Sequence, residues 1–195
     1  QMTESELGEV PKNWRVKTLG DVLELAYGKP LREDNREAGT IPVYGSNGQI
    51  GWHNESLVKG PGIIVGRKGN PGTVLWSEMD FFPIDTTFYV IPKVNASSLH
   101  YLFYVLKNQG LPSLSADSAV PGLNRNIAYM NNILIPSEQV LTQFGQLVNS
   151  LNAKIFLNER ESRILESIRD SILPRLMSGK IRVPITKKLE PGIHA

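Results

Sequence analysis

The composition of the last third of the chain constrains the fold more than any other feature. Between Ser137 and Gly179 the only glycine is Gly145 and the only proline is Pro174. Apolar residues recur there at spacings of three and four, the pattern of an amphipathic helix. They are Val140, Phe144, Leu147 and Leu151, followed by Leu165, Ile168 and Ile172. We predict one helix, or two nearly continuous ones, of about 40 residues and roughly 60 Å.

The apolar seam of this helix is too long for one small domain to cover. The seam therefore needs a partner outside the chain's own globular part. Lys154, Asn158 and Glu161 lie along the same seam, where polar residues can fix register and orientation. In an alternative arrangement, residues 140–151 pack back onto the globular part, and only residues 154–177 need a neighbour.

Three residues mark the ends of the predicted helix. Ser137 is a favourable N-cap, Pro174 should mark a last kinked turn, and Gly179 should end the helix. We expect the tail beyond residue 183 to be frayed.

The region before the helix has the pattern of a mixed domain. In residues 14–135, short apolar runs are broken by Gly, Pro, Asn and Asp, as in strands and loops. Strands are predicted at 62–66, 74–76, 87–91 and 132–135. Helices are predicted at 18–25, with Thr18 and Asp21 at its start, and at 97–108, stopped by Gly110. The fold class is therefore α+β, with a globular domain at 11–136, a long helix at 137–180 and a tail at 181–195.

Composition narrows the class of protein without naming a partner. The 195 residues are 41% hydrophobic, enough for the core of one domain plus an extension. The absence of cysteine excludes disulfides, thiolate metal sites and a cysteine nucleophile, and it is compatible with a reducing cytosol. Neither a membrane span nor an export signal is recognisable, so we expect a soluble, cytoplasmic protein. A net charge of +2 is too small to indicate a nucleic-acid binder by itself.

The motifs that a DNA-acting enzyme would need are missing from the sequence. Common metal-dependent nucleases use Asp-x-Lys or Glu-x-Lys, and adenine methyltransferases use Asn-Pro-Pro-Tyr or Asp-Pro-Pro-Tyr; none of these occurs. His53, His100 and His194 are far apart and have no acidic partners at ligand spacing, so zinc is not expected. We therefore expect no catalytic residue, no metal and no cofactor in this chain.

Three segments resemble a known family. The opening GEVPKNW (residues 8–14) with KTLGD (17–21) resembles the start of a target-recognition domain in type I restriction-modification specificity subunits. The segment IRDSILPRLMSGKI (168–181) is similar to the end of that family's conserved helix, and ILIP (133–136) is similar to its domain-to-helix junction. Together these matches frame nearly the whole chain.

This resemblance implies a subunit that selects DNA and catalyses nothing. Partner methyltransferase subunits would modify adenine with S-adenosylmethionine, and a translocating restriction subunit would cut. Complete members of the family have two recognition domains and two antiparallel helices that read a split target. Here each element occurs once, so the chain either pairs with itself or is a fragment.

Self-pairing would bury the same apolar stripe from both copies and place one recognition domain at each end of the paired helices. Such a homodimer would read an inverted repeat, with half-site spacing set by helix length. The residues expected at the dimer interface are Leu151, Leu165, Ile168 and Ile172. A dimeric coiled-coil adaptor, or a silent specificity fragment without DNA reading, remains the alternative.

Three polar loops are candidates for contacts with double-stranded DNA, because their side chains can pair with base edges or phosphates. The first, at 44–49, contributes Ser46, Asn47 and Gln49, although Asn47-Gly48 also favours a simple type I′ hairpin turn. The second, GRKGNPG (66–72), contributes Arg67, Lys68 and Asn70, which suit phosphate contacts; a solvated turn is the alternative.

The third loop, at 118–126, contributes Asn124, Arg125 and Asn126, which could read adenine or guanine. A surface loop that braces the following strand is an equal alternative. Arg32, Arg36 and the Asp85-Thr86-Thr87 step are weaker candidates, the last being better explained as a capped turn at a strand entry.

Overall fold

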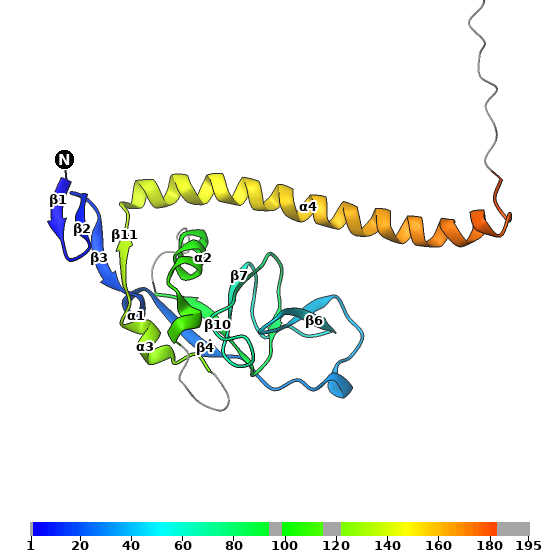
Figure 1. Cartoon of the computed structure of the whole chain (residues 1–195), viewed down its shortest axis with the longest axis horizontal. Coiled ribbons are helices and arrows are strands. Elements are labelled where there is room, and N and C mark those ends of the chain that lie inside the picture. The colour runs from blue at the N-terminus through cyan, green and yellow to red at the C-terminus, as the bar shows by residue number, and fades with distance from the viewer. Residues whose placement is uncertain (1, 94–98, 115–121, 183–195) are drawn as a thin grey trace, which may run out of the picture. The chain divides into compact units, whose positions relative to one another are not determined.

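The computed structural model describes residues 2–93, 99–114 and 122–182. The chain divides into two compact units, Gln1–Leu151 and Asn152–Ala195. The first contains the sheets and the short helices, and the second contains the distal part of the long helix α4 (Glu138–Met177) (Figure 1). The predicted α+β class is confirmed. The expected tail at 183–195 and residues 118–121 of the third loop lie outside the described residues.

A four-stranded antiparallel sheet forms the centre of the first unit. Its order is β4 (Leu23–Tyr27), β10 (Thr87–Pro92), β7 (Gly62–Gly66) and β8 (Val74–Ser77). All five residues of β7 are buried, which explains why this strand is an uninterrupted apolar run. The predicted strands at 62–66, 74–76 and 87–91 are therefore confirmed.

The described residues also form three smaller sheets. β5 (Ile41–Gly45) pairs with β6 (Gly48–His53) on one side and, in parallel, with β9 (Phe82–Pro83) on the other. β3 (Arg15–Thr18) pairs with β11 (Asn132–Ile135), the fourth predicted strand. β1 (Met2–Ser5) and β2 (Gly8–Pro11) form a hairpin at the N-terminal end (Figure 1).

The helix predicted at 18–25 is only partly correct. Helix α1 (Leu19–Val22) starts as predicted, since the backbone N–H and the hydroxyl of Thr18 donate to Asp21 Oδ2 at 3.0 and 2.8 Å. Its extension to residue 25 is wrong, because Leu23–Tyr27 pairs with β10. Leu23 and Leu25 are buried while Glu24 is exposed, which is the two-residue period of a strand.

The described residues of the first unit also form two further short helices and two 3-10 turns. α2 (Leu99–Asn108) buries Leu102, Phe103 and Leu106, and Gly110 follows it with φ +61°, in agreement with the predicted stop. Residues 97 and 98 of that prediction lie outside the described residues. α3 (Arg125–Tyr129) was not predicted as a helix. The 3-10 turns are Glu33–Asn35 and Leu111–Leu114.

The long helix is confirmed as one continuous element of 40 residues. The carbonyl of Ser137 accepts the Leu141 N–H at 3.0 Å, which closes the first turn. The helix continues through Pro174, so this proline lies inside the last turn and does not end it. Gly179, with φ +69°, then terminates the helix, and the Ile181 N–H donates to the Arg175 carbonyl at 3.1 Å.

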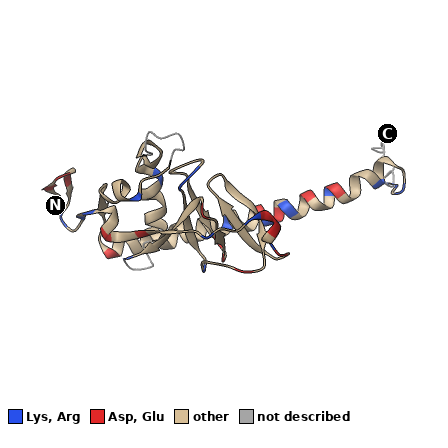
Figure 2. Ribbon diagram, turned by 90° about the horizontal axis from the view of Figure 1, so that it is seen from below, with Lys and Arg blue, Asp and Glu red and all other residues tan. Residues whose placement is uncertain are grey.

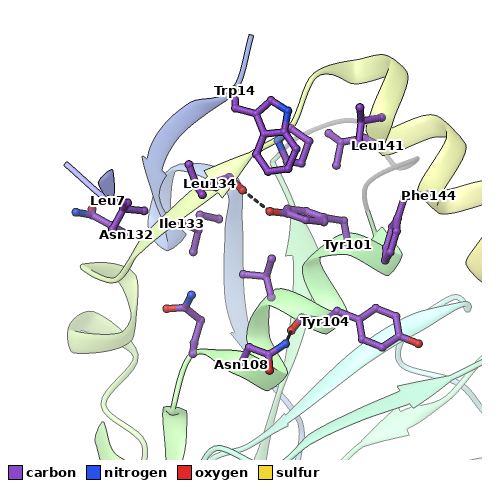
Figure 3. A pocket seen from close by; sticks show the side chains of 14 residues that line it. Leu7, Trp14, Tyr101, Tyr104, Asn108, Asn132, Ile133, Leu134, Leu141 and Phe144 are labelled. Atoms are coloured by element: carbon purple, nitrogen blue, oxygen red, sulfur yellow. Dashed lines mark hydrogen bonds between the residues drawn. The ribbon is translucent and has the colours of Figure 1, made fainter. Parts of the chain in front are cut away.

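The first turns of α4 pack within the first unit. The ring of Phe144 lies 6.2 Å from that of Tyr101 and 5.9 Å from that of Tyr104, and Val148 is buried. The rings of Phe144, Tyr101 and Tyr104 border an apolar pocket of about 500 Å³, in which the Tyr101 hydroxyl donates to the Leu134 carbonyl (Figure 3). Burial raises the pKa of Tyr101.

The alternative in which residues 140–151 pack back onto the domain is therefore correct for one side of the helix. Leu147 and Leu151, on its other side, remain 61% and 54% exposed.

Candidate nucleic-acid interface

The second and third polar loops meet at one pocket. They are far apart in sequence, but Lys68 and Gly122 form an antiparallel β-bridge and the Leu123 N–H donates to the Arg67 carbonyl at 2.9 Å. Between them lies a pocket of about 300 Å³. It is lined by Tyr27, Arg67, Lys68, Phe88, Gly122, Leu123, Asn124, Arg125 and Asn126. Five of the nine residues expected to contact DNA thus line a single cavity.

Backbone hydrogen bonds fix the cationic side of this pocket. The N–H groups of Arg67 and Lys68 both donate to the Thr86 carbonyl, at 2.9 and 3.1 Å. The turn that follows needs Gly72, whose φ is +81° and where a Cβ would lie 2.4 Å from the Pro112 nitrogen. The chain direction at Arg67 and Lys68 is therefore set by the fold.

Helix α3 and strand β4 form the opposite side of the pocket. Arg125 and Tyr129 are four residues apart and so share one face of α3. The Arg125 guanidinium donates to the Leu25 carbonyl at 3.0 Å, and the Tyr129 hydroxyl accepts the Leu25 N–H at 2.8 Å. Arg125 thus holds α3 against β4 in addition to lining the pocket.

Asn124 caps α3 with part of its side chain. Its Oδ1 accepts the backbone N–H groups of Asn126 and Ile127, at 3.0 and 3.4 Å. Asn126 is exposed at the pocket. The oxygen of the Asn124 carboxamide is therefore engaged by the helix, whereas its NH₂ group has no hydrogen-bond partner in the described part of the chain.

The first polar loop is a hairpin beside the second loop. Ser46 is buried, and its hydroxyl contacts the carbonyl oxygens of Lys68 and Thr86, so it links the two loops. Asn47 and Gln49 are exposed but are not among the residues that line the pocket. The alternative of a hairpin turn is correct, because β5 pairs with β6, but the turn is not type I′: among the described residues none other than glycine has a positive φ, so Asn47 does not adopt that conformation.

The remaining candidates lie outside the pocket. Asn70 is exposed, and its carbonyl accepts the Thr73 hydroxyl at 3.0 Å. Arg32 is exposed just before a 3-10 turn, and Arg36 donates to the Ile50 carbonyl at 2.9 Å. The Thr87 hydroxyl donates to the Ile84 carbonyl at 2.7 Å, in agreement with a capped turn at this strand entry.

Tyr27 is a pocket residue that the sequence analysis missed. It is the last residue of β4 and half exposed, and its ring lies 4.6 Å from Arg125 Cζ and 5.2 Å from Arg67 Cζ. The alternation of Leu23, Glu24 and Leu25 before it was the available signal, because it identifies a strand ending at this tyrosine.

The residues expected at a dimer interface all belong to α4 and are exposed. Leu151, Leu165, Ile168 and Ile172 retain 54%, 58%, 46% and 38% of their accessible surface. Acidic and basic residues alternate along the distal half of the helix (Figure 2). α4 therefore combines an unpaired apolar stripe with a mixed charged surface.

Within the described residues, no group of three or more His, Cys, Asp and Glu side chains could hold a metal ion. Among the helices of the same residues, none is both long and apolar enough to cross a bilayer.

A model of the type I restriction modification DNA specificity domain matches residues 11–165. The chain therefore belongs to this family. The match includes the globular domain and α4 up to residue 165, and the family is the one that the resemblance in the sequence implied.

Curated relatives carry the same description. The MjaIX specificity subunit of a type I restriction enzyme from Methanocaldococcus jannaschii is 28% identical over 90% of this chain and 46% of its own length. The HindI specificity subunit from Haemophilus influenzae is 25% identical over 88% of this chain and 42% of its own length. The chain thus spans about half the length of these relatives.

Solved structures share the fold. The S subunit of a type I restriction-modification system from M. genitalium superposes with a TM-score of 0.72 at 16% identity, over 85% of this chain and 46% of that one. The HsdS subunit from Thermoanaerobacter tengcongensis gives a TM-score of 0.50 at 15% identity, over 91% and 48%. At these identities the likeness concerns the fold alone.

Proposed function

We propose that this chain reads one half of a bipartite DNA target for a type I restriction-modification system. In this proposal residues 11–136 recognise DNA, and residues 137–180 pair with a second copy and direct methyltransferase and restriction subunits to the site. The observation that carries it is the meeting of Arg67, Lys68 and Asn124–Asn126 at one pocket, in a chain of this family.

The chemistry of the candidate residues divides them into two roles. Arg67 and Lys68, fixed by their backbone contacts, suit phosphate oxygens, which position a protein on the duplex without reading sequence. The exposed amides of Asn47, Gln49, Asn70 and Asn126 can pair with base edges. Ser46, whose hydroxyl is engaged inside the domain, holds the loops together in this scheme.

The test of DNA reading uses the chain with its methyltransferase partner, which supplies S-adenosylmethionine chemistry. We expect sequence-specific retardation of DNA and a methylated motif in the genome of a host that expresses the complex. Lys68→Gln should weaken binding to all sequences. It should also reduce the slope of log K against log salt by about one. Lys107→Gln, at another exposed lysine, on α2, is the matched control.

Absence of both specific retardation and methylation would refute DNA reading. If the chain still dimerised in that case, the coiled-coil adaptor would be the better description. Because the proposed target is cellular DNA, we place the chain in the cytoplasm.

Self-pairing is supported by the spacing of the exposed residues of α4. Leu151, Asn158, Leu165 and Ile172 recur every seven residues, and Leu147, Lys154, Glu161 and Ile168 form a second row three residues out of phase. These rows are the a and d positions of a coiled coil.

The polar residues within these rows favour an antiparallel pair. In a parallel pair Lys154 would face Lys154 and Glu161 would face Glu161, and like charges repel. In an antiparallel pair, Leu151 can face Ile168, Leu147 can face Ile172, and Asn158 can face Glu161. That register keeps the apolar pairs toward the ends, sets Lys154 opposite Leu165, and places Asn158 opposite Glu161 at the centre.

Cysteine cross-linking tests this register cleanly, because the chain has no cysteine of its own. Co-expressed copies carrying Leu151→Cys and Ile168→Cys should form a disulfide-linked dimer. Neither variant alone should do so, since two copies of residue 151 would lie about 25 Å apart along the axis. Cross-linking of each variant to itself would instead establish a parallel pair and overturn the register.

A further inference from the structure

The ring of Tyr27 is held in place by the sheet beneath it. Tyr27 ends β4 opposite Phe88 of β10, which is almost completely buried. The two rings are 5.0 Å apart and inclined by 54°, a favourable tilted contact. The half of Tyr27 that remains exposed is therefore presented on a rigid support.

Two guanidinium groups contact this ring, but within the described residues only that of Arg125 has another anchor. Arg125 also donates to the Leu25 carbonyl, so its position is fixed twice. Arg67 contacts the ring, and its buried Nε has no hydrogen-bond partner among the described residues. The orientation of the Arg67 head group thus depends on Tyr27.

The two guanidinium groups also make this pocket positively charged, which favours the binding of an anion. Both guanidinium carbons lie within 5.2 Å of the same ring centroid. Their charges are therefore separated by less than about 10 Å, comparable to the screening length at physiological salt. The electron-rich ring face offsets part of the repulsion, and a phosphate at the pocket would offset more.

We propose that Tyr27 is a positioning residue for DNA binding: its ring holds the Arg67 guanidinium in the orientation that meets a DNA phosphate. The inference rests on the proposed function and assigns to Tyr27 a role that no DNA-contacting motif in the sequence indicates. Tyr27 acts through Arg67 and need not touch DNA itself.

The test compares variants of the full chain in complex with its methyltransferase partner, using a duplex that contains the methylated motif. Tyr27→Leu removes the ring and should weaken binding about 3- to 30-fold, the range expected for a partly desolvated cation–π contact. Tyr27→Phe keeps the ring and should retain most of the affinity. Trp52→Leu, at a similarly exposed ring on β6, is the matched control for loss of a surface aromatic side chain.

The salt dependence separates positioning from a general loss of structure. Tyr27→Leu should reduce the slope of log K against log salt as Arg67→Gln does, because the same phosphate contact is lost. In an Arg67→Gln background, Tyr27→Leu should cause no further loss. If Tyr27→Leu does not fold, Tyr27→Val repeats the test with a side chain that suits a strand.

Unchanged affinity in Tyr27→Leu, losses that add to those of Arg67→Gln, or a Tyr27→Phe variant as weak as Tyr27→Leu would each overturn the positioning role. Failure of the unmutated complex to bind any motif would instead refute the proposed function itself, so the two failures are distinguishable.

Discussion

At the scale of single residues, Asp21 shows how one exposed carboxylate ties the first helix to the sheet. It accepts hydrogen bonds from the Thr18 hydroxyl and the Thr18 backbone, and these bonds, the hydroxyl first, lower the pKa of Asp21 below 3.8. The folded state therefore prefers the ionised form more than the unfolded state does. The resulting stability is present above the unfolded pKa and is lost as pH falls through the lowered one.

Replacing Asp21 by Asn should therefore destabilise the protein at neutral pH and progressively less in acid. The urea midpoint of both proteins, measured from pH of about 7 down to about 2.5, should converge below pH of about 4. Asp34→Asn, at an exposed aspartate, should leave the midpoint unchanged. A difference between the Asp21 variant and the parent that persisted unchanged in acid would exclude the charge as the cause.

Residue types indicated which side chains could bind DNA, but not which were already engaged. Ser46 and Asn124 suit base contacts by chemistry, yet the Ser46 hydroxyl bonds backbone carbonyls and Asn124 Oδ1 caps α3. Arg125 similarly holds β4. These partners are distant in sequence or depend on an unpredicted helix, so composition and spacing could not reveal them.

At the scale of secondary-structure elements, those with the longest periodic sequence pattern were predicted best. α4 has 40 residues, with apolar residues at spacings of three and four on both sides of a polar middle, and it was predicted almost to its ends. β4 reads in the sequence as a continuation of α1, because a short apolar run fits both the helical and the strand period. In the structure Val22 ends the helix and Leu23 begins the strand, and pairing with β10 decides between the two periods.

The position of Pro174 predicts how the end of α4 responds to mutation. It lies inside the last turn of α4, has no N–H to donate to the Asp170 carbonyl, and crowds that carbonyl with its ring. Pro174→Ala should therefore stabilise the end of the helix by roughly 1 to 3 kcal/mol. Hydrogen exchange of residues 170–177 should slow, and exchange in β7 should not change. Faster exchange at 170–177 would show that the proline supports the helix end.

At the scale of the whole molecule, the exposed face of α4 determines the expected assembly. Ile168 lies on the proposed seam opposite Leu151, whereas Leu173 is exposed on a different face, at 46% and 49% respectively. Ile168→Glu should raise the dimer dissociation constant at least about tenfold, because it places a charge in an apolar contact. Leu173→Glu should leave it unchanged. Light scattering across a concentration series measures both, and equal effects would exclude this seam.

The meeting of two candidate DNA-binding loops at one pocket is also a property of the whole molecule. Loops at 66–72 and 122–126 each had suitable residues, but their meeting at one pocket depends on the contact between Lys68 and Gly122, which are far apart in the sequence. Local patterns carry no information on such contacts. The ring of Tyr27 between the two arginines is a product of the same tertiary packing.

The exposed apolar stripe of α4 also affects the steady-state level of this protein in a cell. A copy without a partner presents Leu151, Leu165, Ile168 and Ile172 to solvent, the kind of surface that chaperones and proteases recognise. Unassembled copies should therefore turn over faster than assembled ones. The level of the chain would then follow the supply of its partners, and surplus copies would be removed before they could occupy DNA unproductively.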